Sequence, residues 1–514
     1  MTAQIPAQAR IFLTASEAYP ALETLFLDAK EEILAGFRVF DPATPLYSDR
    51  GRDIGDTWFD LIEHTLRRGV RFRMLLTDFD PIIRPDMHRA TWLSKRRMIL
   101  AAEASGNPHL LDIVPAMHPA RVGWLPRIFL WPKIISEIRT EVKRLNALPE
   151  QEAAIQLKHA PGLCQYISGD HPDLKVSLRQ FPALIPTTHH QKLAIADGTR
   201  LMLGGLDLNE RRYDTPEHRR DGPQTWHDAQ IMCEGPIVEQ AQRHLTEMLA
   251  VTNGTQAPQS LPLMLRTLSR KRNNAAFHMS PHTVLNKIEV AHLDMIAKAQ
   301  HLIYLESQYF RSRVIAKALA RAAREKPDLK LILVLPAAPD DVAFEHSTKS
   351  DARFGEYLQA KAVRKVTRAF GKRCLVMSPA RPVTLDNDSG RAAHFKAPMI
   401  YLHAKVSIFD DTDAIISSAN LNGRSMRWDT EVGMHLTDPQ TVATLKQRSF
   451  DHWLPQDATP DYHDLQTAVS AWRKLAVRNA KLEPEQRAGF VLPFPIAPAR
   501  RFGRNLPAVP EELV

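Results

Sequence analysis

The sequence predicts an α/β protein of two similar halves, with mixed, mainly parallel sheets packed pseudo-twofold around one shared active site. Two observations predict this class. A His-x-Lys-x4-Asp pattern occurs twice, far apart in the chain. In each half, a strand-like, a helix-like and a second strand-like segment also follow one another, and this order implies parallel strands joined by helical crossovers.

The segments that carry this order alternate between continuous apolar runs and helical periodicity. They are 33–40, 57–66 and 70–76 in the first half, and 302–309, 314–324 and 329–335 in the second. A chain of 514 residues can bury more than one core, so a division into domains is expected.

Composition places the boundaries between the parts. Residues 255–262 are rich in Pro, Gln and Ser, which is typical of a junction. We therefore expect a first half over 1–258, a second half over 259–460, and a C-terminal helix with a Pro-rich tail over 461–514. The tail is expected to be an extended surface strap.

The first half is expected to contain an insert at about 81–173. Within it, residues 123–135 place aromatic and aliphatic side chains beside cations, and a helical pattern follows over 136–145. Such a segment is typical of an element that dips into a lipid interface. The same pattern also fits a helix hairpin packed on the sheet. The sequence leaves both interpretations open.

The repeated pattern is followed at the same distance by a pair of small residues. The two copies are His190, Lys192, Asp197 and Gly204-Gly205 in the first half, and His403, Lys405, Asp410 and Ser417-Ser418 in the second. On a strand, positions i and i+2 point to the same face, so each His and Lys would project together. Two imidazoles and two ammoniums suit an anionic substrate, with one His attacking and the other protonating the leaving group.

Each copy also carries a carboxylate at matching depth. Asp228 stands eight residues before Pro236, and Glu431 stands eight residues before Pro439. A buried carboxylate can hold one nitrogen of an imidazole and fix its tautomer. The two copies therefore predict two equivalent half-sites.

At this point the chain resembles the phospholipase D superfamily, whose members show H-x-K-x4-D-x6-G-[GS] twice. Three further runs resemble its phosphatidylcholine-cleaving branch: 204–208, 226–228 and 305–310. The run 418–431 is similar to the pattern of the whole family. The likeness covers about residues 10 to 455, with a gap in the middle. Ser417 stands where the second copy usually has Gly, and Ser307 where the branch has Asn.

The resemblance implies a role for each matching position. His190 would be the nucleophile, and His403 the general acid and then the base. The phosphate would be bound by Lys192, Lys405 and Asn420. In the orienting role, Asp228 and Glu431 would hold His190 and His403. The motif aspartates, Asp197 and Asp410, belong to the catalytic pattern but are expected to be structural and to pair within their turns. Asp207 stands where many bacterial members have Asn, and it is not expected to contact the phosphate.

The implied activity is hydrolysis of glycerophospholipids to phosphatidic acid and a free headgroup alcohol through a phosphohistidine, with transfer to another alcohol as a corollary. A nuclease or other phosphodiesterase of the same superfamily is the alternative, and a catalytically inactive membrane-binding protein is a third. No metal or other cofactor is expected, since a lysine between the ligands repels a cation. Four other histidines are expected to be hydrogen-bonded core residues: His218, His227, His301 and His394.

Composition and charge bound the partners. The net charge of +9 favours anionic partners, and both phospholipids and nucleic acid fit it. Because one chain carries both motifs, we expect a monomer acting on a phospholipid bilayer or lipid aggregate and not on nucleic acid. The first residues show no signal-peptide pattern. A cytoplasmic or peripheral membrane location is therefore expected, with export lacking a cleavable signal left open.

Overall fold

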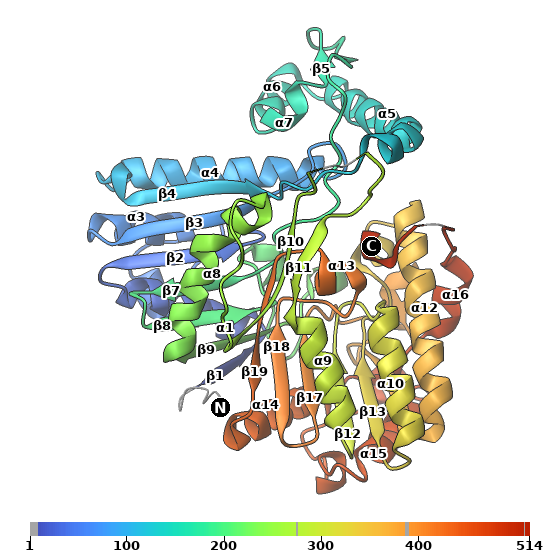
Figure 1. Cartoon of the computed structure of the whole chain (residues 1–514). Helices are drawn as coiled ribbons and strands as arrows, with labels where there is room; N and C mark the ends of the chain where they lie inside the picture. The colour runs from blue at the N-terminus through green and yellow to red at the C-terminus, as the bar shows by residue number, and fades with distance from the viewer. Residues whose placement is uncertain (1–8, 274–275, 386–389, 508) are drawn as a thin grey trace.

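The computed structural model describes residues 9–273, 276–385, 390–507 and 509–514. Two large sheets form the centre of the molecule, one in each half, with helices on their outer faces (Figure 1). This arrangement confirms the predicted α/β class with two similar halves. The first half ends with helix α8 (Pro236–Asn253), and the second begins with strand β10 (Met264–Arg270), so the connection between them spans 254–263.

The sheet of the first half has seven strands in the order β1-β9-β8-β7-β2-β3-β4. Their bounds are Arg10–Leu13 (β1), Ala229–Glu234 (β9), Arg200–Gly204 (β8), Leu193–Ala196 (β7), Glu32–Phe37 (β2), Arg71–Asp78 (β3) and Leu111–Met117 (β4). Strands β2 and β3 are parallel and joined through helix α3 (Trp58–Arg67), as the sequence predicts. Helices α1 (Ala15–Asp28) and α4 (Pro85–Ala104) complete this half.

The sheet of the second half has nine strands in the order β11-β10-β19-β18-β17-β12-β13-β14-β20. The new bounds are His282–Asn286 (β11), Glu431–Leu436 (β19), Asp413–Ser417 (β18), Val406–Phe409 (β17), Leu302–Glu306 (β12), Lys330–Val334 (β13), Cys374–Pro379 (β14) and Val491–Pro493 (β20). Helix α10 (Arg313–Glu325) joins the parallel pair β12 and β13. The other long helices are α9 (Lys287–Lys298), α12 (Ser350–Phe370), α14 (Pro439–Trp453) and α15 (Ala468–Asn479).

The prediction of mainly parallel sheets is wrong. Among the described strands of each large sheet, the parallel pairs are only those of the crossover units, β2-β3-β4 and β12-β13-β14. The strands that follow each His-x-Lys segment form antiparallel hairpins, β7-β8-β9 and β17-β18-β19. Connections such as 197–199 and 410–412 are too short for a helical crossover, so these strands must reverse direction.

One core spans the boundary between the halves. Leu193 and Leu245 of the first half share a cluster of buried side chains with Ile408, Val432 and Leu445 of the second. Burying apolar surface from both halves together holds them in a fixed relation. The two halves therefore pack as one body.

The insert begins later in the chain than predicted. Helix α4 and strand β4 lie within 81–173 but belong to the first half, because β4 extends the sheet beside β3. The excursion consists of helices α5 (Trp124–Asn146), α6 (Glu150–Lys158) and α7 (Pro161–Cys164) with the short pair β5 (Ile167–Ser168) and β6 (Lys175–Val176). It projects from one end of the molecule (Figure 1) and has its own buried cluster around Ile134, Ile138 and Tyr166.

The expectation of an extended C-terminal strap is also wrong. Strand β20 pairs antiparallel with β14 and extends the second sheet, and helix α16 (Ile496–Phe502) packs on α12. Val491 and Leu492 are fully buried, so the apolar residues between the prolines are the reason that this segment docks. Among the described residues, no helix is both long and apolar enough to cross a membrane.

Candidate active site

The two His-x-Lys segments lie side by side at the boundary between the halves. They are extended but precede the strands, which begin at Leu193 and Val406. The prediction that His and Lys lie within strands is therefore wrong by a few residues. The reason is that each segment bonds to the opposite half. The backbone N–H of His190 donates to the carbonyl of Thr430 at 2.9 Å, and that of His403 donates to His227 at 2.8 Å.

These backbone contacts are equivalent in the two halves. His189 bridges Thr430, and His227 bridges Leu402, both in parallel orientation. Thr430 precedes Glu431, and His227 precedes Asp228. Each bridge therefore brings the carboxylate of one half beside the imidazole of the other.

The side chains pair crosswise as a result. His403 Nδ1 lies 2.6 Å from Asp228 Oδ2, and His190 Nδ1 lies 3.0 Å from Glu431 Oε1. The predicted order, Asp228 with His190 and Glu431 with His403, is wrong for this reason. Because Nδ1 is held in both rings, Nε2 of each imidazole is the nitrogen left for a substrate.

Burial sets the protonation of the two imidazoles. It lowers the pKa of His190 and of His403 well below the ordinary value, and the neighbouring lysines lower both further. Burial raises the pKa of Asp228, and raises that of Glu431 to about 8. A neutral imidazole keeps a lone pair on Nε2, which a nucleophile or general base requires.

The two lysines are buried next to their own histidines. Lys192 Nζ donates to the His190 carbonyl at 2.6 Å, and Lys405 Nζ lies 2.9 Å from His403 Nδ1. Burial lowers the pKa of Lys192 to about 8 and that of Lys405 to about 7, although nearby carboxylates oppose the shift. An anion between the two ammoniums would recover the charge stabilisation that burial removes.

Asp207 is one of the carboxylates that oppose the lowering of the two lysine pKa values. Its Oδ2 lies 3.7 Å from both Lys192 Nζ and Arg212 Nε, and its Oδ1 accepts from the Val39 backbone at 2.8 Å. The carboxylate therefore faces cations of the protein. Asn420 holds a different position: its Nδ2 donates to Gln308 Oε1 at 3.2 Å, and its buried Oδ1 has no hydrogen-bond partner among the residues that the structure describes.

The motif aspartates stand apart from the imidazoles. Asp197 accepts hydrogen bonds from three consecutive backbone N–H groups, those of residues 30–32, and Asp410 does the same for residues 300–302. Both have positive φ, 51° and 53°. The expected pairing within their own turns is wrong, because each carboxylate ties its turn to the start of a neighbouring strand.

Several groups at the site were missed by the sequence analysis. The Trp226 ring lies 4.6 Å from the His403 ring, and the guanidinium of Arg212 lies over Trp226 at 5.1 Å. Burial is the largest cause of the lowered pKa of both imidazoles, and Arg38 is among the nearby cations that lower both further. Arg38 follows β2, about 150 residues before His190, and no local spacing could have linked it to the motif.

The pair of small residues after each motif also has a structural reason. A Cβ on Gly205 would lie 2.1 Å from Asp228 Oδ1. Ser418 occupies the equivalent place in the second half, and its hydroxyl donates to Glu431 Oε2. The first half-site therefore needs a glycine beside its carboxylate, while the second uses a serine hydroxyl.

The predicted core histidines divide into two groups. His218 and His394 are buried and hydrogen-bonded, as expected. His227 is buried, but neither of its ring nitrogens has a hydrogen bond within the described part of the chain, so the prediction holds for its burial alone. His301 is exposed, so that prediction is wrong. It follows helix α9 at the start of β12, and its Nδ1 contacts Gln466 at 2.9 Å at the surface.

The fold consists of two equivalent α/β halves. Each half contributes one His-Lys pair to a single composite site, and this arrangement is the class to which the protein is compared. A family model described as "Cardiolipin synthase, PLD-like domain" matches residues 292–453, which carry the second half-site. Together with the relatives below, this match confirms the resemblance to the phospholipase D superfamily.

The relatives are distant. The chain is 24% identical to phospholipase D1 of Saccharomyces cerevisiae, over 50% of this chain and 20% of that protein. It is 25% identical to phospholipase D alpha 1 of Oryza sativa subsp. japonica, over 50% of this chain and 46% of that protein. The chain thus spans less than half the length of these two relatives.

A solved structure shows the same fold over nearly the whole chain. Phosphatidylserine synthase of Haemophilus influenzae superposes with a TM-score of 0.52 at 12% sequence identity, covering 94% of this chain and 97% of that one. At this identity the likeness concerns the fold alone.

Proposed function

We propose that this protein is a phospholipase D-type phosphodiesterase that hydrolyses glycerophospholipids to phosphatidic acid and a free headgroup alcohol. The observation that carries the proposal is the crosswise site. Two imidazoles are held at Nδ1 by Glu431 and Asp228, and two buried lysines lie beside them. These groups suit a phosphodiester, because the lysines neutralise its oxygens and the imidazoles face it with Nε2.

In the first step, Nε2 of His190 attacks the phosphorus, and the bond from phosphorus to the headgroup oxygen breaks. The bound anionic phosphate and Asp228 favour a proton on His403, which gives a proton from Nε2 to the departing oxygen. In the second step, His403 removes a proton from water, the water oxygen bonds to phosphorus, and the phosphorus–nitrogen bond to His190 breaks. A primary alcohol in place of water would give a new phosphatidyl ester by the same step.

The carboxylates support these roles. Asp228 stabilises the positive charge on His403 in the protonated state. When Nε2 of His190 bonds to phosphorus, the charge on His190 lowers the raised pKa of Glu431, and the ionised Glu431 then stabilises that charge. Lys192, Lys405 and Asn420 would hold the non-bridging oxygens. The names of the curated relatives favour a lipid substrate over a nucleic acid.

The excursion around α5 supports contact with a bilayer. Trp124, Ile128 and Phe129 lie in the first turns of α5 and are exposed, Phe129 at 83%. Arg127 lies over the Phe181 ring at 4.6 Å, so a cation stands beside these apolar groups. Apolar side chains flanked by cations suit the boundary between lipid tails and headgroups.

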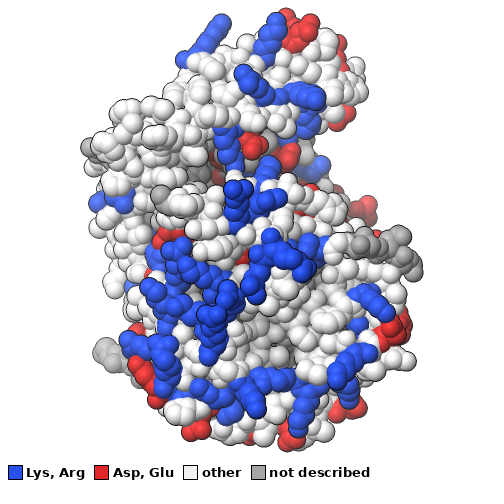
Figure 2. Space-filling view, turned by 90° about the vertical axis from the view of Figure 1, so that its right-hand side faces the viewer, with Lys and Arg blue, Asp and Glu red and all other residues white. Residues whose placement is uncertain are grey.

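A basic surface on the second half supports the same partner. Lys and Arg side chains crowd the face formed by α12 and α16 (Figure 2). A groove of about 760 Å³ on this face is lined by six of these side chains: Lys361, Arg364, Lys365, Arg368, Arg500 and Arg504. Such a surface attracts anionic headgroups. We therefore propose a monomer that works as a peripheral protein at a phospholipid surface.

The test is lipid turnover by the purified protein on phosphatidylcholine and phosphatidylethanolamine vesicles containing ethanol. Phosphatidic acid and phosphatidylethanol from wild type, with neither from His190→Ala, is the expected result. No turnover of either lipid, together with cleavage of single- or double-stranded nucleic acid that His190→Ala abolishes, would overturn the lipid substrate in favour of a nuclease. No turnover of any diester, with vesicle binding equal in wild type and His190→Ala, would overturn the enzyme in favour of a binding protein.

A further inference from the structure

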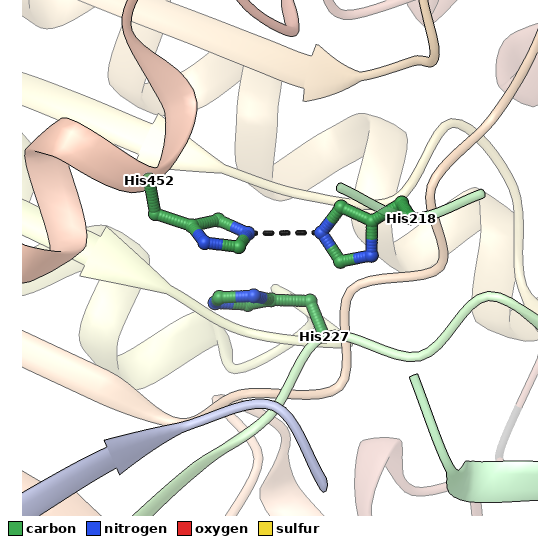
Figure 3. A group of neighbouring side chains, drawn as sticks. All are labelled: His218, His227 and His452. Atoms are coloured by element: carbon green, nitrogen blue, oxygen red, sulfur yellow. Dashed lines mark hydrogen bonds between the residues drawn. The ribbon is translucent and has the colours of Figure 1, made fainter. Parts of the chain in front are cut away.

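Three histidines that the proposed chemistry does not use lie close together (Figure 3). His218 comes from the connection between β8 and β9, His227 immediately precedes Asp228, and His452 lies in the last turn of α14. Each offers a ring nitrogen, and these atoms all lie within 4.8 Å of one another. Two of the three belong to the first half and one to the second, so the cluster spans the boundary.

His218 is held as metal-binding histidines are held. Its Nδ1 lies 2.6 Å from Asp214 Oδ2, and the same oxygen accepts from the Trp226 backbone N–H at 2.7 Å. A carboxylate on one ring nitrogen fixes the tautomer and directs the other nitrogen, Nε2, toward a ligand. That Nε2 faces His452 Nε2 at 2.9 Å (Figure 3).

Neither ring nitrogen of His227 makes a hydrogen bond within the described part of the chain, although Nε2 lies 3.4 Å from Glu306 Oε2. Its side chain is completely buried. A single proton between His218 Nε2 and His452 Nε2 gives both of these nitrogens a hydrogen bond. It provides no hydrogen bond to His227. Buried polar groups without partners are rare and costly, so each one requires an explanation.

A second unsatisfied group lies beside it. Glu306 Oε1 accepts from Trp453 Nε1 at 2.8 Å and from Tyr304 at 2.5 Å, whereas Oε2 has no hydrogen bond and lies 3.4 Å from His227 Nε2. Asp214 and Glu306 therefore place two buried carboxylates next to three imidazoles. Arg448, one turn before His452, is paired with Glu17 and does not balance them.

We propose that His218, His227 and His452 bind one divalent transition-metal ion of the zinc type. Three imidazoles suit such an ion, with a fourth position for water or a carboxylate. The ion would give the ring of His227 a ligand bond and would place a positive charge next to the carboxyl groups of Asp214 and Glu306. Unlike the His-x-Lys segments, this cluster has no lysine among its ligands.

The role that follows is positional. The His227 carbonyl accepts from the backbone N–H groups of His403 and Ala404 at 2.8 and 3.0 Å, and the next residue is Asp228. An ion that fixes His227 to α14 would fix the segment that carries Asp228 against the segment that carries His403. The ion would thus stabilise the crosswise pairing without touching the substrate.

The experiment measures metal binding directly and needs no turnover, so it stands apart from the test of the proposed function. The full chain is dialysed against a chelator and titrated with Zn²⁺, and bound metal and Tm are measured. We expect one Zn²⁺ per chain and a Tm raised by several degrees. Cobalt(II) in the same place should give the visible absorption of a four-coordinate ion.

Two variants and a control decide the assignment. His452→Ala should abolish the Tm shift, and Asp214→Asn, which removes only the group that orients His218, should weaken Zn²⁺ binding about 10- to 100-fold. His301→Ala, an exposed histidine outside the cluster, should behave as wild type. Wild type that takes up no Zn²⁺, or His452→Ala that binds Zn²⁺ as wild type does, would overturn the proposal.

Discussion

Asp228 holds the imidazole of His403 across the boundary between the halves, with 2.6 Å between Oδ2 and Nδ1. Glu431 holds His190 in the same way from the opposite side. Neither half therefore contains a complete site: each supplies an imidazole, a lysine and the carboxylate for the other half's imidazole. Exchange of carboxylates couples the packing of the halves to the chemistry, since any shift at the boundary moves both pairs.

The crosswise pairing predicts different kinetic effects for the two carboxylates. Asp228→Asn should impair His403 and slow lipid turnover by about 10²- to 10⁴-fold, the usual contribution of general acid–base catalysis. With a nitrophenyl phosphodiester, whose leaving group needs no proton, the same variant should keep the initial burst of nitrophenolate. Glu431→Gln should slow the burst itself, because it impairs His190. If Asp228→Asn slowed the burst and Glu431→Gln kept it, the roles of His190 and His403 would be exchanged.

The glycine beside Asp228 predicts an asymmetry between the half-sites. Gly205→Ala places a Cβ 2.1 Å from Asp228 Oδ1, so the carboxylate must move away from His403. We expect kcat to fall by about 100-fold, since a displacement of about 1 Å is enough for this. Ser418→Gly is the matched variant, and loss of one hydrogen bond to Glu431 should cost only about tenfold. Equal effects of both substitutions would contradict this account.

The lowered lysine pKa values predict the alkaline side of the pH profile. Below pH 7 both ammoniums are charged and bind the phosphate. As the pH rises through about 7 and then about 8, Lys405 and Lys192 lose their charge in the free enzyme. Measured kcat/KM should therefore fall by at least about tenfold between pH 7 and 9. For kcat at saturating substrate, the fall should lie at higher pH, because a bound anion raises both pKa values. A kcat/KM that still increases at pH 9 would refute this prediction.

The motif aspartates should affect stability and leave the chemistry intact. Asp410→Ala removes the acceptor for three backbone N–H groups and should lower the free energy of unfolding by about 1–3 kcal/mol, measured in urea. The activity per folded molecule should remain that of wild type at 20 °C. If Asp410→Ala were fully folded and inactive, the carboxylate would have a catalytic role.

Asp197 adds a dependence on pH. Although burial raises its pKa, three backbone hydrogen bonds hold that pKa below the ordinary value. A carboxyl whose pKa is lowered on folding stabilises the fold above its unfolded pKa, and this stability is lost as the pH falls through the folded pKa. Wild type should therefore lose more stability than Asp197→Asn on acidification below about pH 4. If the free energies of unfolding of wild type and Asp197→Asn fell equally as the pH was lowered, this prediction would be wrong.

The exposed face of α5 predicts how the protein reaches lipid. Phe129→Glu should weaken binding to anionic vesicles about tenfold or more, since a phenylalanine contributes roughly 1.5–3 kcal/mol when buried. Val477→Glu on α15, also at an exposed apolar position, is the control and should bind as wild type. Turnover of a soluble short-chain phospholipid should be the same for both variants. If Phe129→Glu left vesicle binding unchanged, α5 would have a packing role and no role in lipid contact.

Much of the fold followed from periodicity and repetition. The crossover units around α3 and α10 were predictable because buried strands and amphipathic helices have distinct periods. The antiparallel hairpins were not, since the short turns after Ala196 and Phe409 were read only as part of a motif. The docking of β20 was also missed, because proline content suggested an extended strap although Val491 and Leu492 provide apolar contact.

The sequence by itself determined which residues carry the chemistry, because their types and spacing occur twice: His190 and Lys192, His403 and Lys405, with a carboxylate at equal depth in each copy. Only the tertiary structure decided that the carboxylates are exchanged between the halves, and that Arg38 and Trp226 join the site. Spacing along a chain records position within one half. Contacts across a boundary depend on how two halves pack, and that packing is set by a core to which both contribute.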